Sequence, residues 1–233
     1  MGPKIGTTIV VIPSFNEGRT IGSIVRNIVE MGMSVLVVDD GSTDATERAA
    51  LDNGAMVIRH KHNKGKGSSI RQGIDYVSQK TKFEWVVLMD GDGQHHTEDI
   101  MMLMEGARDD AADMVTGNRM SDTENMPRIR YLTNRFTSFV VSRMCRQFIP
   151  DTQCGFRLVR SAALEQLNLE SSRYDIESEM LIKAARCGCR IKSVPVRTIY
   201  GDEISQIHPV RDTLRFFYLV IRYQVGSIFK KNK

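Results

Sequence analysis

Short apolar runs rich in β-branched residues alternate with segments of helical spacing in the first half of the chain. In those segments apolar residues recur every three or four positions, as at Ile21, Ile24 and Ile28, which is typical of a helix with one buried side. This alternation predicts an α/β fold with a mostly parallel, Rossmann-like sheet flanked by helices. The predicted strands are residues 7–13, 34–38, 55–59, 84–89 and 113–117.

The second half of the chain is less regular. No internal repeat and no Pro/Gly-rich linker divides the 233 residues, a length that can bury one large core. We therefore expect a single domain over residues 1–208, followed by a basic amphipathic helix over 209–233. The other predicted elements are helices over 130–148 and 174–187 and strands over 154–159 and 190–198.

Polar and charged residues follow the predicted strands directly. In open parallel sheets, ligands bind beyond the carboxyl ends of the strands, so these residues should gather at one edge. A site at this edge would combine acidic, aromatic and basic groups. The segments are Pro13–Glu17, Asp39–Asp44, the segment that begins at Asp90, and Asn118–Arg119.

The segment after the fourth strand, Asp90-Gly-Asp-Gly-Gln-His95, has the chemistry of a metal site. Asp90 and Asp92 offer hard carboxylate oxygens, which favour Mg²⁺ or Mn²⁺ held together with substrate phosphates. Gly91 between them lets the backbone approach a ligand closely. A strand followed by an ordinary polar turn is the alternative. A calcium loop is excluded, because His95 and Met101 stand where its glycine and bidentate glutamate are required.

Acidic residues after the first two strands allow two interpretations. Asp39 and Asp40 would suit a ribose or a base edge. They would also precede the start of a helix at which Asp44 is the N-cap and Glu47 completes a capping box. We expect both roles. Glu17 would contact the nucleotide or serve as a first-turn acid beside a helix dipole. With metal-suited carboxylates and arginines at the same edge, these acids indicate a nucleotide-linked phosphate substrate.

The glycine-rich segment 63–69 is not a P-loop, because Gly67 stands where Ser or Thr is required. It fits a turn that opens a helix near the nucleotide.

Charge and cysteine content restrict the setting of the protein. The net charge of +4 fits anionic substrates or lipid head groups without requiring nucleic acid. The four cysteines show no C-x-x-C pair and no zinc spacing, which indicates free thiols in a reducing compartment. No apolar run approaches the ~18 to 20 residues of a membrane span. We therefore expect a cytoplasmic protein that does not cross a bilayer.

The order of the motifs resembles that of family 2 glycosyltransferases with the GT-A fold, especially the polyprenyl-phosphate sugar synthases typified by dolichyl-phosphate mannose synthase. The resemblance covers nearly the whole chain. It rests on Pro13-Ser-Phe-Asn-Glu17, Val38-Asp-Asp-Gly-Ser-Thr-Asp-Ala-Thr46, the Asp90 segment, Gly117-Asn-Arg119, Asp151 with Gly155-Phe156, and Glu179 ahead of Val194-Pro195.

This resemblance implies roles for residues in the same motifs. Arg119 and Arg130 are expected to meet the diphosphate and the acceptor phosphate. The implied metal ligands are Asp90, Asp92 and Gln94. The implied donor-binding residues are Pro13, Phe15, Glu17, Asp40, Asp90, Gly91, Asp92 and Arg119. The residues expected to take part in catalysis are Asp92, Arg119, Arg130, Asp151 and Glu179.

The implied reaction is the metal-dependent, inverting transfer of a hexose from GDP-mannose or a UDP-sugar to a polyprenyl (dolichyl) phosphate. Such a phosphate is already anionic near neutral pH, so positioning and charge neutralisation would carry most of the catalysis. A saccharide or protein hydroxyl is the alternative acceptor, and Asp151 or Glu179 would then remove its proton. Gln206 stands where many relatives carry a phosphate-gripping lysine, which leaves the acceptor open, with His208 or Arg211 as possible replacements.

Two other classes of function are less favoured. A sugar-phosphate nucleotidyltransferase usually has a glycine- and basic-rich phosphate loop after the first strand, where this chain has Ser14-Phe-Asn-Glu17. A binding domain without catalysis is disfavoured because both metal acids, Gln94 and Arg119 are present.

The predicted helix over 130–148 carries an apolar stripe beside arginines, a pattern suited to a membrane interface. Packing of this stripe into the core is the alternative. We expect this helix and the C-terminal one to rest on an anionic bilayer, which makes the protein peripheral on the inner face of the membrane; its oligomeric state is left open. The stripe consists of Leu132, Phe136, Phe139, Val140 and Met144.

Overall fold

The computed structural model describes residues 2–80, 83–108, 112–124, 126–199 and 209–230, and it describes side chains of the last helix over 214–224. Within these residues, seven strands form one sheet in the order β3-β2-β1-β4-β6-β5-β7. Strand β6 runs antiparallel to β4 and β5, and the other neighbouring pairs are parallel. The predicted α/β class with a mostly parallel sheet is confirmed. The strands are β1 (Thr8–Ser14), β2 (Ser34–Asp39), β3 (Met56–Arg59), β4 (Trp85–Leu88), β5 (Met114–Asn118), β6 (Arg157–Arg160) and β7 (Ile191–Pro195).

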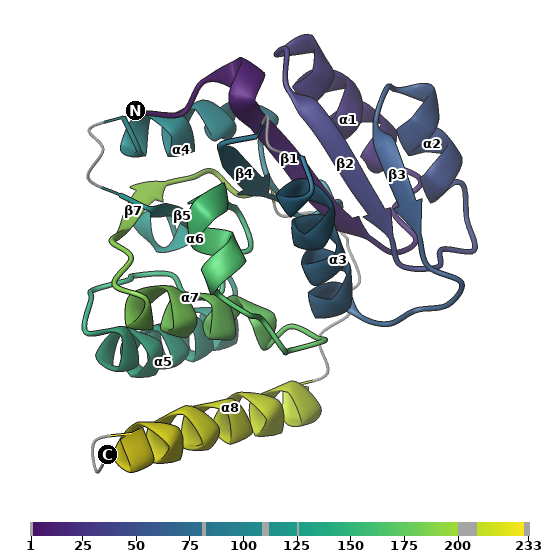
Figure 1. The fold of residues 1–233 in the computed structure, drawn as a ribbon. Helices are drawn as coiled ribbons and strands as arrows, with labels where there is room; N and C mark the ends of the chain where they lie inside the picture. Colours follow the sequence, from purple (N-terminus) through teal and green to yellow (C-terminus); the bar gives the residue numbers. More distant parts are fainter. Residues whose placement is uncertain (1, 81–82, 109–111, 125, 200–208, 231–233) are drawn as a thin grey trace.

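Helices cover both faces of the sheet (Figure 1). Side chains of β1 alternate between the two resulting cores, with Val10 and Ile12 in one and Ile9 and Val11 in the other, and all four are fully buried. Burial on both faces explains why the strands are continuous apolar runs rather than alternating ones. The helices are α1 (Ile21–Glu30), α2 (Thr46–Asp52), α3 (Lys66–Ser78), α4 (Ile100–Gly106), α5 (Arg128–Cys145), α6 (Ser161–Gln166), α7 (Ile176–Arg186) and α8 (Pro209–Lys230).

The predicted and observed elements differ mainly in the second half. The sequence does not predict α6, whose six residues are too few to show a periodicity. The predicted strand over 190–198 ends early, at Pro195, which has no N–H to continue a ladder. Beyond it, Thr198 forms a single bridge with His95, so this segment returns to the loop that carries the predicted metal ligands.

The apolar stripe of α5 faces outward. Leu132, Phe136 and Phe139 are 63%, 52% and 66% exposed, so packing in the core is wrong for these three residues. Val140 and Met144 are half-buried against the core. The buried side of α5 is instead largely small and polar, which is possible because its hydroxyls are paired; for example, Ser138 Oγ accepts a hydrogen bond from the Thr152 N–H. Its members are Asn134, Thr137, Ser138, Val141 and Cys145.

Helix α8 runs beneath α5 and α7 (Figure 1). Phe216, Leu219 and Tyr223 are buried against the rest of the protein, and the Tyr223 hydroxyl donates a hydrogen bond to Glu179 at 3.0 Å. The opposite side of this helix is apolar and exposed, as Leu214 and Tyr218 show. Thus α8 is packed on the domain through one face while a second apolar face is left open.

Two further predictions concern the setting of the chain. Among the described residues, no helix combines the length and the apolar character that a bilayer span requires. All four cysteines are free, as predicted, with Cys187 exposed and the others buried.

A close contact between α3 and β1 gives a test of the packing. A Cβ atom on Gly73 would lie 2.4 Å from Cγ1 of Val11. An exposed helix would gain up to about 1 kcal/mol from Gly→Ala, whereas overpacking here should cost about 1–3 kcal/mol. We expect Gly73→Ala to lower the free energy of unfolding in urea. Gly6→Ala, whose added Cβ meets nothing within 4 Å, is the control and should change stability little. Equal stability of the two variants would contradict this packing.

Candidate active site

Hydrogen bonds join the loops after β1 and β2 at the carboxyl edge of the sheet. Asn16 has a left-handed backbone (φ 59°), its N–H donates to Ser42 Oγ, and its side-chain oxygen accepts from the Thr43 N–H, both at 2.9 Å. The Glu17 N–H donates to Thr46 Oγ1 at 2.8 Å. These contacts bring the predicted donor-binding segment Pro13–Glu17 beside the segment that contains Asp40.

The predicted capping box at the start of α2 is wrong. Asp44 does accept a hydrogen bond from the Thr46 N–H, but its second oxygen accepts from the Gly18 N–H in the neighbouring loop. Glu47 contacts Arg59 on β3 and makes no reciprocal cap. Tertiary partners have therefore replaced the local motif.

Asp40 anchors the glycine-rich turn. Its carboxylate accepts hydrogen bonds from the N–H groups of Lys64 and Gly65, at 2.8 and 2.7 Å, and lies 2.6 Å from His60 Nδ1. The other ring nitrogen of His60 contacts Gln72 of α3. Both oxygens of Asp40 are therefore engaged within the protein, and its role in holding a nucleoside stays a prediction.

The glycine-rich segment opens a helix, as predicted. Gly65 has φ +99° and α3 begins at the next residue, Lys66. A Cβ on Gly67 would lie 2.5 Å from the Ser171 carbonyl oxygen, so this turn is packed tightly against the segment before α7. The position of the turn directs Lys66 toward the predicted metal loop.

Asp90 lies in a cluster of partly and fully buried charged side chains. Lys66 Nζ is 2.6 Å from Asp90 Oδ1 and 2.8 Å from Glu177 Oε1, and Arg157 holds the other oxygen of Glu177 at 3.1 Å. Burial alone would raise the pKa of Asp90, but the Lys66 ammonium and other nearby cations lower it below its ordinary value. Asp90 is therefore a carboxylate at neutral pH. A Cβ at Gly155 would lie 2.9 Å from Asp90 Oδ2, so glycine there leaves room beside this oxygen.

The rest of the predicted metal loop is shaped by its glycines. Gly91 approaches Ser14 of β1, where a Cβ would come within 2.5 Å of the buried Ser14 Oγ, and its carbonyl accepts from Thr20 Oγ1 at 2.6 Å. Asp92 Oδ1 accepts the Gln94 N–H at 3.0 Å. The described residues contain no ready-made cluster of three or more His, Cys, Asp or Glu side chains for a metal. Asp90 and Asp92 offer the carboxylate oxygens that an ion such as Mg²⁺ or Mn²⁺ prefers, and such an ion takes its remaining ligands from phosphate and water.

Arg119 and Asp151 form a buried pair. Nε and Nη2 of Arg119 donate to the two carboxylate oxygens of Asp151 at 2.8 and 3.0 Å, and the Arg119 backbone N–H adds a third bond at 3.1 Å. Burial alone would raise the pKa of Asp151, but Arg119 and the Gln153 N–H lower it below its ordinary 3.8. The pair joins the end of β5 to the segment before β6 and fixes the orientation of the guanidinium.

His95, at the end of the Asp90 segment, is buried. Its ring stacks on Phe156 with centroids 4.9 Å apart, and burial lowers its pKa to about 4. The Ile199 N–H donates to the Gln94 carbonyl at 2.9 Å, so the chain beyond β7 covers this part of the loop. The imidazole is therefore neutral near pH 7, and it packs against Phe156 instead of contributing a positive charge.

Two of the residues expected in catalysis, Arg130 and Glu179, form no ion pair with members of this cluster among the described residues. Arg130 is half-buried on the first turn of α5, and its guanidinium forms no ion pair with the described residues. Glu179 is fully buried on α7, where it accepts hydrogen bonds from the N–H groups of Glu170 and Ser171 and from Tyr223. Their catalytic roles stay predictions. Gln206 and His208 lie outside the described residues.

Sequence reasoning missed three members of the cluster: Lys66, Arg157 and Glu177. Lys66 belongs to the glycine-rich segment, and Glu177 lies two residues before Glu179. No spacing in the sequence indicates that α3 and α7 meet at Asp90. A contact between elements so far apart along the chain is visible only in the fold.

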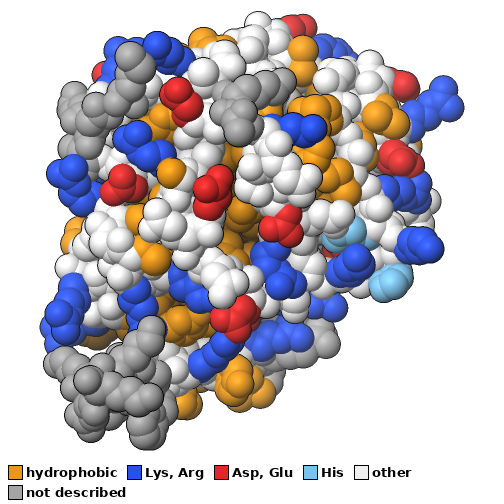
Figure 2. All heavy atoms as spheres, viewed as in Figure 1, with side chains coloured by type: hydrophobic (Ala, Val, Ile, Leu, Met, Phe, Trp, Pro, Cys, Tyr) orange, Lys and Arg blue, Asp and Glu red, His pale blue; other side chains and the backbone are white. Residues whose placement is uncertain are grey.

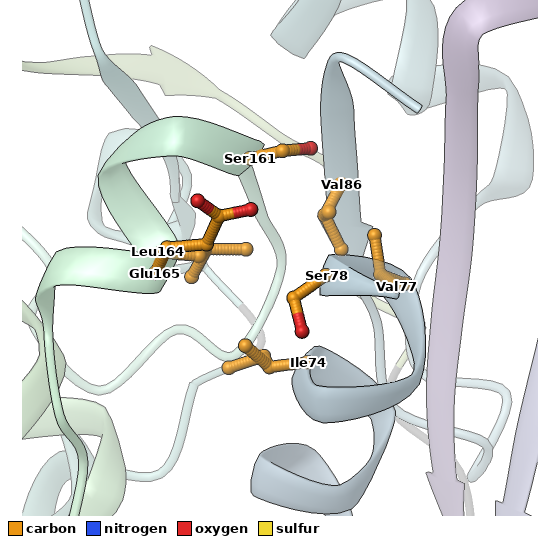
Figure 3. A pocket seen from close by; sticks show the side chains of 7 residues that line it. All are labelled: Ile74, Val77, Ser78, Val86, Ser161, Leu164 and Glu165. Atoms are coloured by element: carbon orange, nitrogen blue, oxygen red, sulfur yellow. The ribbon is translucent and has the colours of Figure 1, made fainter. Parts of the chain in front are cut away.

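A small hollow elsewhere is no candidate for the active site (Figure 3). It lies between α3 and α6, and its walls are mostly apolar, with Glu165 as its one charged lining residue. Ile74, Val77 and Ser78 place it at the far end of α3 from Lys66. It has neither the cations nor the carboxylates of the Asp90 cluster.

Comparison with known proteins decides the family. Residues 9–167 match the model of glycosyl transferase family 2. The chain belongs to this family. It is a glycosyltransferase, and the resemblance inferred from the motifs is confirmed.

Named relatives align over most of their length. A UDP-N-acetylglucosamine–dolichyl-phosphate N-acetylglucosaminyltransferase of Methanococcus voltae is 27% identical, over 94% of this chain and 96% of its own. An undecaprenyl-phosphate mannosyltransferase of Micrococcus luteus is 30% identical, over 81% and 82%. The crystal structure of a glucosyl-3-phosphoglycerate synthase from Mycobacterium tuberculosis, in complex with Mn²⁺, UDP and glucosyl-3-phosphoglycerate, superposes with a TM-score of 0.71 at 19% identity, covering 94% of this chain and 79% of that one. It supports the GT-A fold.

The Arg119–Asp151 pair gives a test of the site's stability. We expect Asp151→Asn to cost about 3–5 kcal/mol of unfolding free energy at pH 7, because it leaves a buried guanidinium unpaired. Since the pKa of Asp151 is lowered in the folded state, its contribution is present above pH 4 and is lost as the pH falls through the folded-state value.

Urea unfolding of the wild type and of Asp151→Asn between pH 7 and pH 3 measures this. The difference between the two proteins should shrink toward acid. Asp122→Asn, at an exposed position, is the control. A difference that is constant with pH would show that the carboxylate charge is not what stabilises Arg119.

Proposed function

We propose that this glycosyltransferase moves a hexose from a nucleoside-diphosphate sugar to a polyprenyl phosphate, with a divalent metal at the Asp90 loop. The observation that carries this proposal is the meeting of metal-suited carboxylates with two cations, the partly buried Lys66 and the buried Arg119, at the carboxyl edge of the sheet. Such a site suits a diphosphate that needs its negative charge neutralised as it leaves. The names of the relatives, and the Mn²⁺ and UDP in the neighbour's crystal structure, support the same substrates and cofactor.

In this proposal, Asp90 and Asp92, with the side-chain oxygen of Gln94, hold Mg²⁺ or Mn²⁺. The ion would neutralise the diphosphate and orient it. Arg119, held rigidly by Asp151, supplies a fixed positive charge at the same edge. The Pro13–Glu17 loop and the Asp40 segment lie beside each other and hold the nucleoside.

The hydrogen bonds and ion pairs of Asp151 and Glu179, the two candidate bases, favour a phosphate acceptor. Both oxygens of Asp151 bind Arg119, and the pKa of Asp151 is lowered, so this carboxylate is a poor proton acceptor. Glu179 is fully buried, and backbone N–H groups and Lys183 occupy its oxygens. A hydroxyl acceptor would need a base, whereas a phosphate monoester needs none.

A lipid acceptor also fits the outer surface. Helices α5 and α8 form the lower part of the molecule in Figure 1. In the same view, Figure 2 shows apolar side chains among basic ones along this lower edge. Phe136 of α5 and Phe217 of α8 meet with ring centroids 6.4 Å apart, so the apolar faces of the two helices are continuous. Exposed arginines lie on α5 and at its C-cap, and each would add about 1 kcal/mol of attraction to an anionic bilayer. They are Arg128, Arg135, Arg143 and Arg146. We propose that this surface rests on the cytoplasmic leaflet.

The catalytic proposal is tested by Asp92→Asn. We expect transfer to fall by a factor of about 10² or more, because a metal ligand and its charge are lost at the leaving diphosphate. The assay offers radiolabelled GDP-mannose, UDP-glucose and UDP-N-acetylglucosamine with Mn²⁺ and measures label in extracted polyprenyl phosphate. Asp75→Asn, on the exposed side of α3, is the matched control and should keep full activity. Undiminished transfer by Asp92→Asn, or label in a saccharide instead of the lipid, would refute the proposal.

The membrane proposal is tested by Phe139→Asp. Removing one interfacial Phe should weaken binding about tenfold or more, because each buried side chain contributes about 1.5–3 kcal/mol. Sedimentation with vesicles that contain an anionic lipid measures the binding at low salt. Leu51→Asp is the control, since Leu51 is 52% exposed but lies on α2, away from this surface. Failure of the wild type to sediment would contradict the proposal, and so would equal loss in both variants.

A further inference from the structure

Lys66 occupies the position beside Asp90 that a metal ion would need. Its ammonium lies 2.6 Å from Asp90 Oδ1 and 2.8 Å from Glu177 Oε1. The side chains of Lys66 and Glu177 are only 15% and 6% exposed, so neither is a mobile surface group. The ammonium is thus ion-paired at once with a predicted metal ligand and with a carboxylate that belongs to no predicted site.

A divalent cation and this ammonium cannot both neutralise Asp90 in the same place. Two positive groups a few ångströms apart in a partly buried site repel each other strongly. Metal entry therefore requires Lys66 to leave Asp90. Glu177 makes this possible, because it already contacts the ammonium and would keep it paired.

Arg157 holds the Glu177 carboxylate in place. Arg157 is fully buried, and it contacts the second oxygen of Glu177 at 3.1 Å. Its remaining N–H groups donate to the carbonyls of Cys154, Glu177 and Thr152. Because Arg157 is fixed by three carbonyls, it fixes Glu177 in turn. The carboxylate that would receive Lys66 is therefore rigid.

We propose that Lys66 stands in for the metal in the free enzyme and is transferred from Asp90 to Glu177 when the metal enters. Lys66 and Glu177 are positioning residues in this exchange. The ammonium keeps metal affinity low until a nucleoside diphosphate arrives, whose negative charge offsets the repulsion between the two cations. Metal and diphosphate then bind cooperatively, each raising the affinity for the other by the same factor. This inference rests on the metal-dependent function proposed above.

The experiment measures Mn²⁺ binding without turnover, from the electron paramagnetic resonance signal of free Mn²⁺. In the absence of nucleotide, Lys66→Met should bind Mn²⁺ about tenfold or more tightly than the wild type. The wild type should gain much more Mn²⁺ affinity on addition of UDP or GDP than Lys66→Met does. Lys64→Met is the matched control: it removes a charge from an exposed side chain of the same turn and should change Mn²⁺ affinity little.

A double-mutant cycle separates exchange from simple charge effects. Glu177→Gln should weaken Mn²⁺ binding, because Lys66 then has only Asp90 as its charged partner. If Glu177 acts through Lys66, this loss should largely disappear in Lys66→Met/Glu177→Gln. Additive effects of the two changes would overturn the proposal, and so would unchanged nucleotide-free affinity in Lys66→Met.

Two further measurements keep the result unambiguous. Circular dichroism without metal shows whether each variant is folded, and Lys66→Gln replaces Lys66→Met if the latter is not. Glycosyl transfer by the wild type is measured separately. Transfer that depends on Mn²⁺ together with unchanged affinity in the Lys66 variant would overturn the exchange and leave the proposed function intact. Absence of transfer to polyprenyl phosphate would overturn the function itself.

Discussion

The site depends on a lysine held between two carboxylates. Lys66, at the start of α3, joins Asp90 after β4 to Glu177 on α7, so three elements distant in sequence meet at one ammonium. Burial would lower the pKa of Lys66, but the two carboxylates raise it above its ordinary value, and the group stays charged. Removing either carboxylate would leave a buried charge less well compensated, which is costly in a protein interior. The arrangement therefore constrains the packing of α3 and α7 at the sheet edge as well as the chemistry there.

The parallel sheet explains why the functional groups meet where they do. β1, β2 and β4 run in the same direction, so their carboxyl ends bring Asn16, Asp40 and Asp90 to one edge. The second half of the chain completes the site from the other side. The antiparallel β6 begins directly after the segment that carries Asp151 and Gly155, and α7 supplies Glu177. A charged substrate thus meets groups from both halves of a single domain.

Much of this organisation is visible in the sequence, and the reasons for the exceptions are physical. The central strands of the first half are predictable because they are buried on both faces and end in polar residues. Asp90, Asp92 and Arg119 could be identified as candidates because each directly follows a strand. The capping box at Asp44 was mispredicted because a tertiary partner, Gly18, competes for the same carboxylate. Lys66 and Glu177 were not predicted, since no local pattern indicates that α3 faces α7.

The central claim is that the acids at 90 and 92 hold a metal ion that replaces the Lys66 ammonium. Anomalous diffraction from crystals soaked with Mn²⁺ and a nucleoside diphosphate tests it most directly. The claim requires a Mn²⁺ peak next to both carboxylates, a diphosphate bound to the ion, and Lys66 Nζ paired with Glu177 but no longer with Asp90. A Mn²⁺ ion located away from these two side chains, or bound there while Lys66 still contacts Asp90, would contradict it.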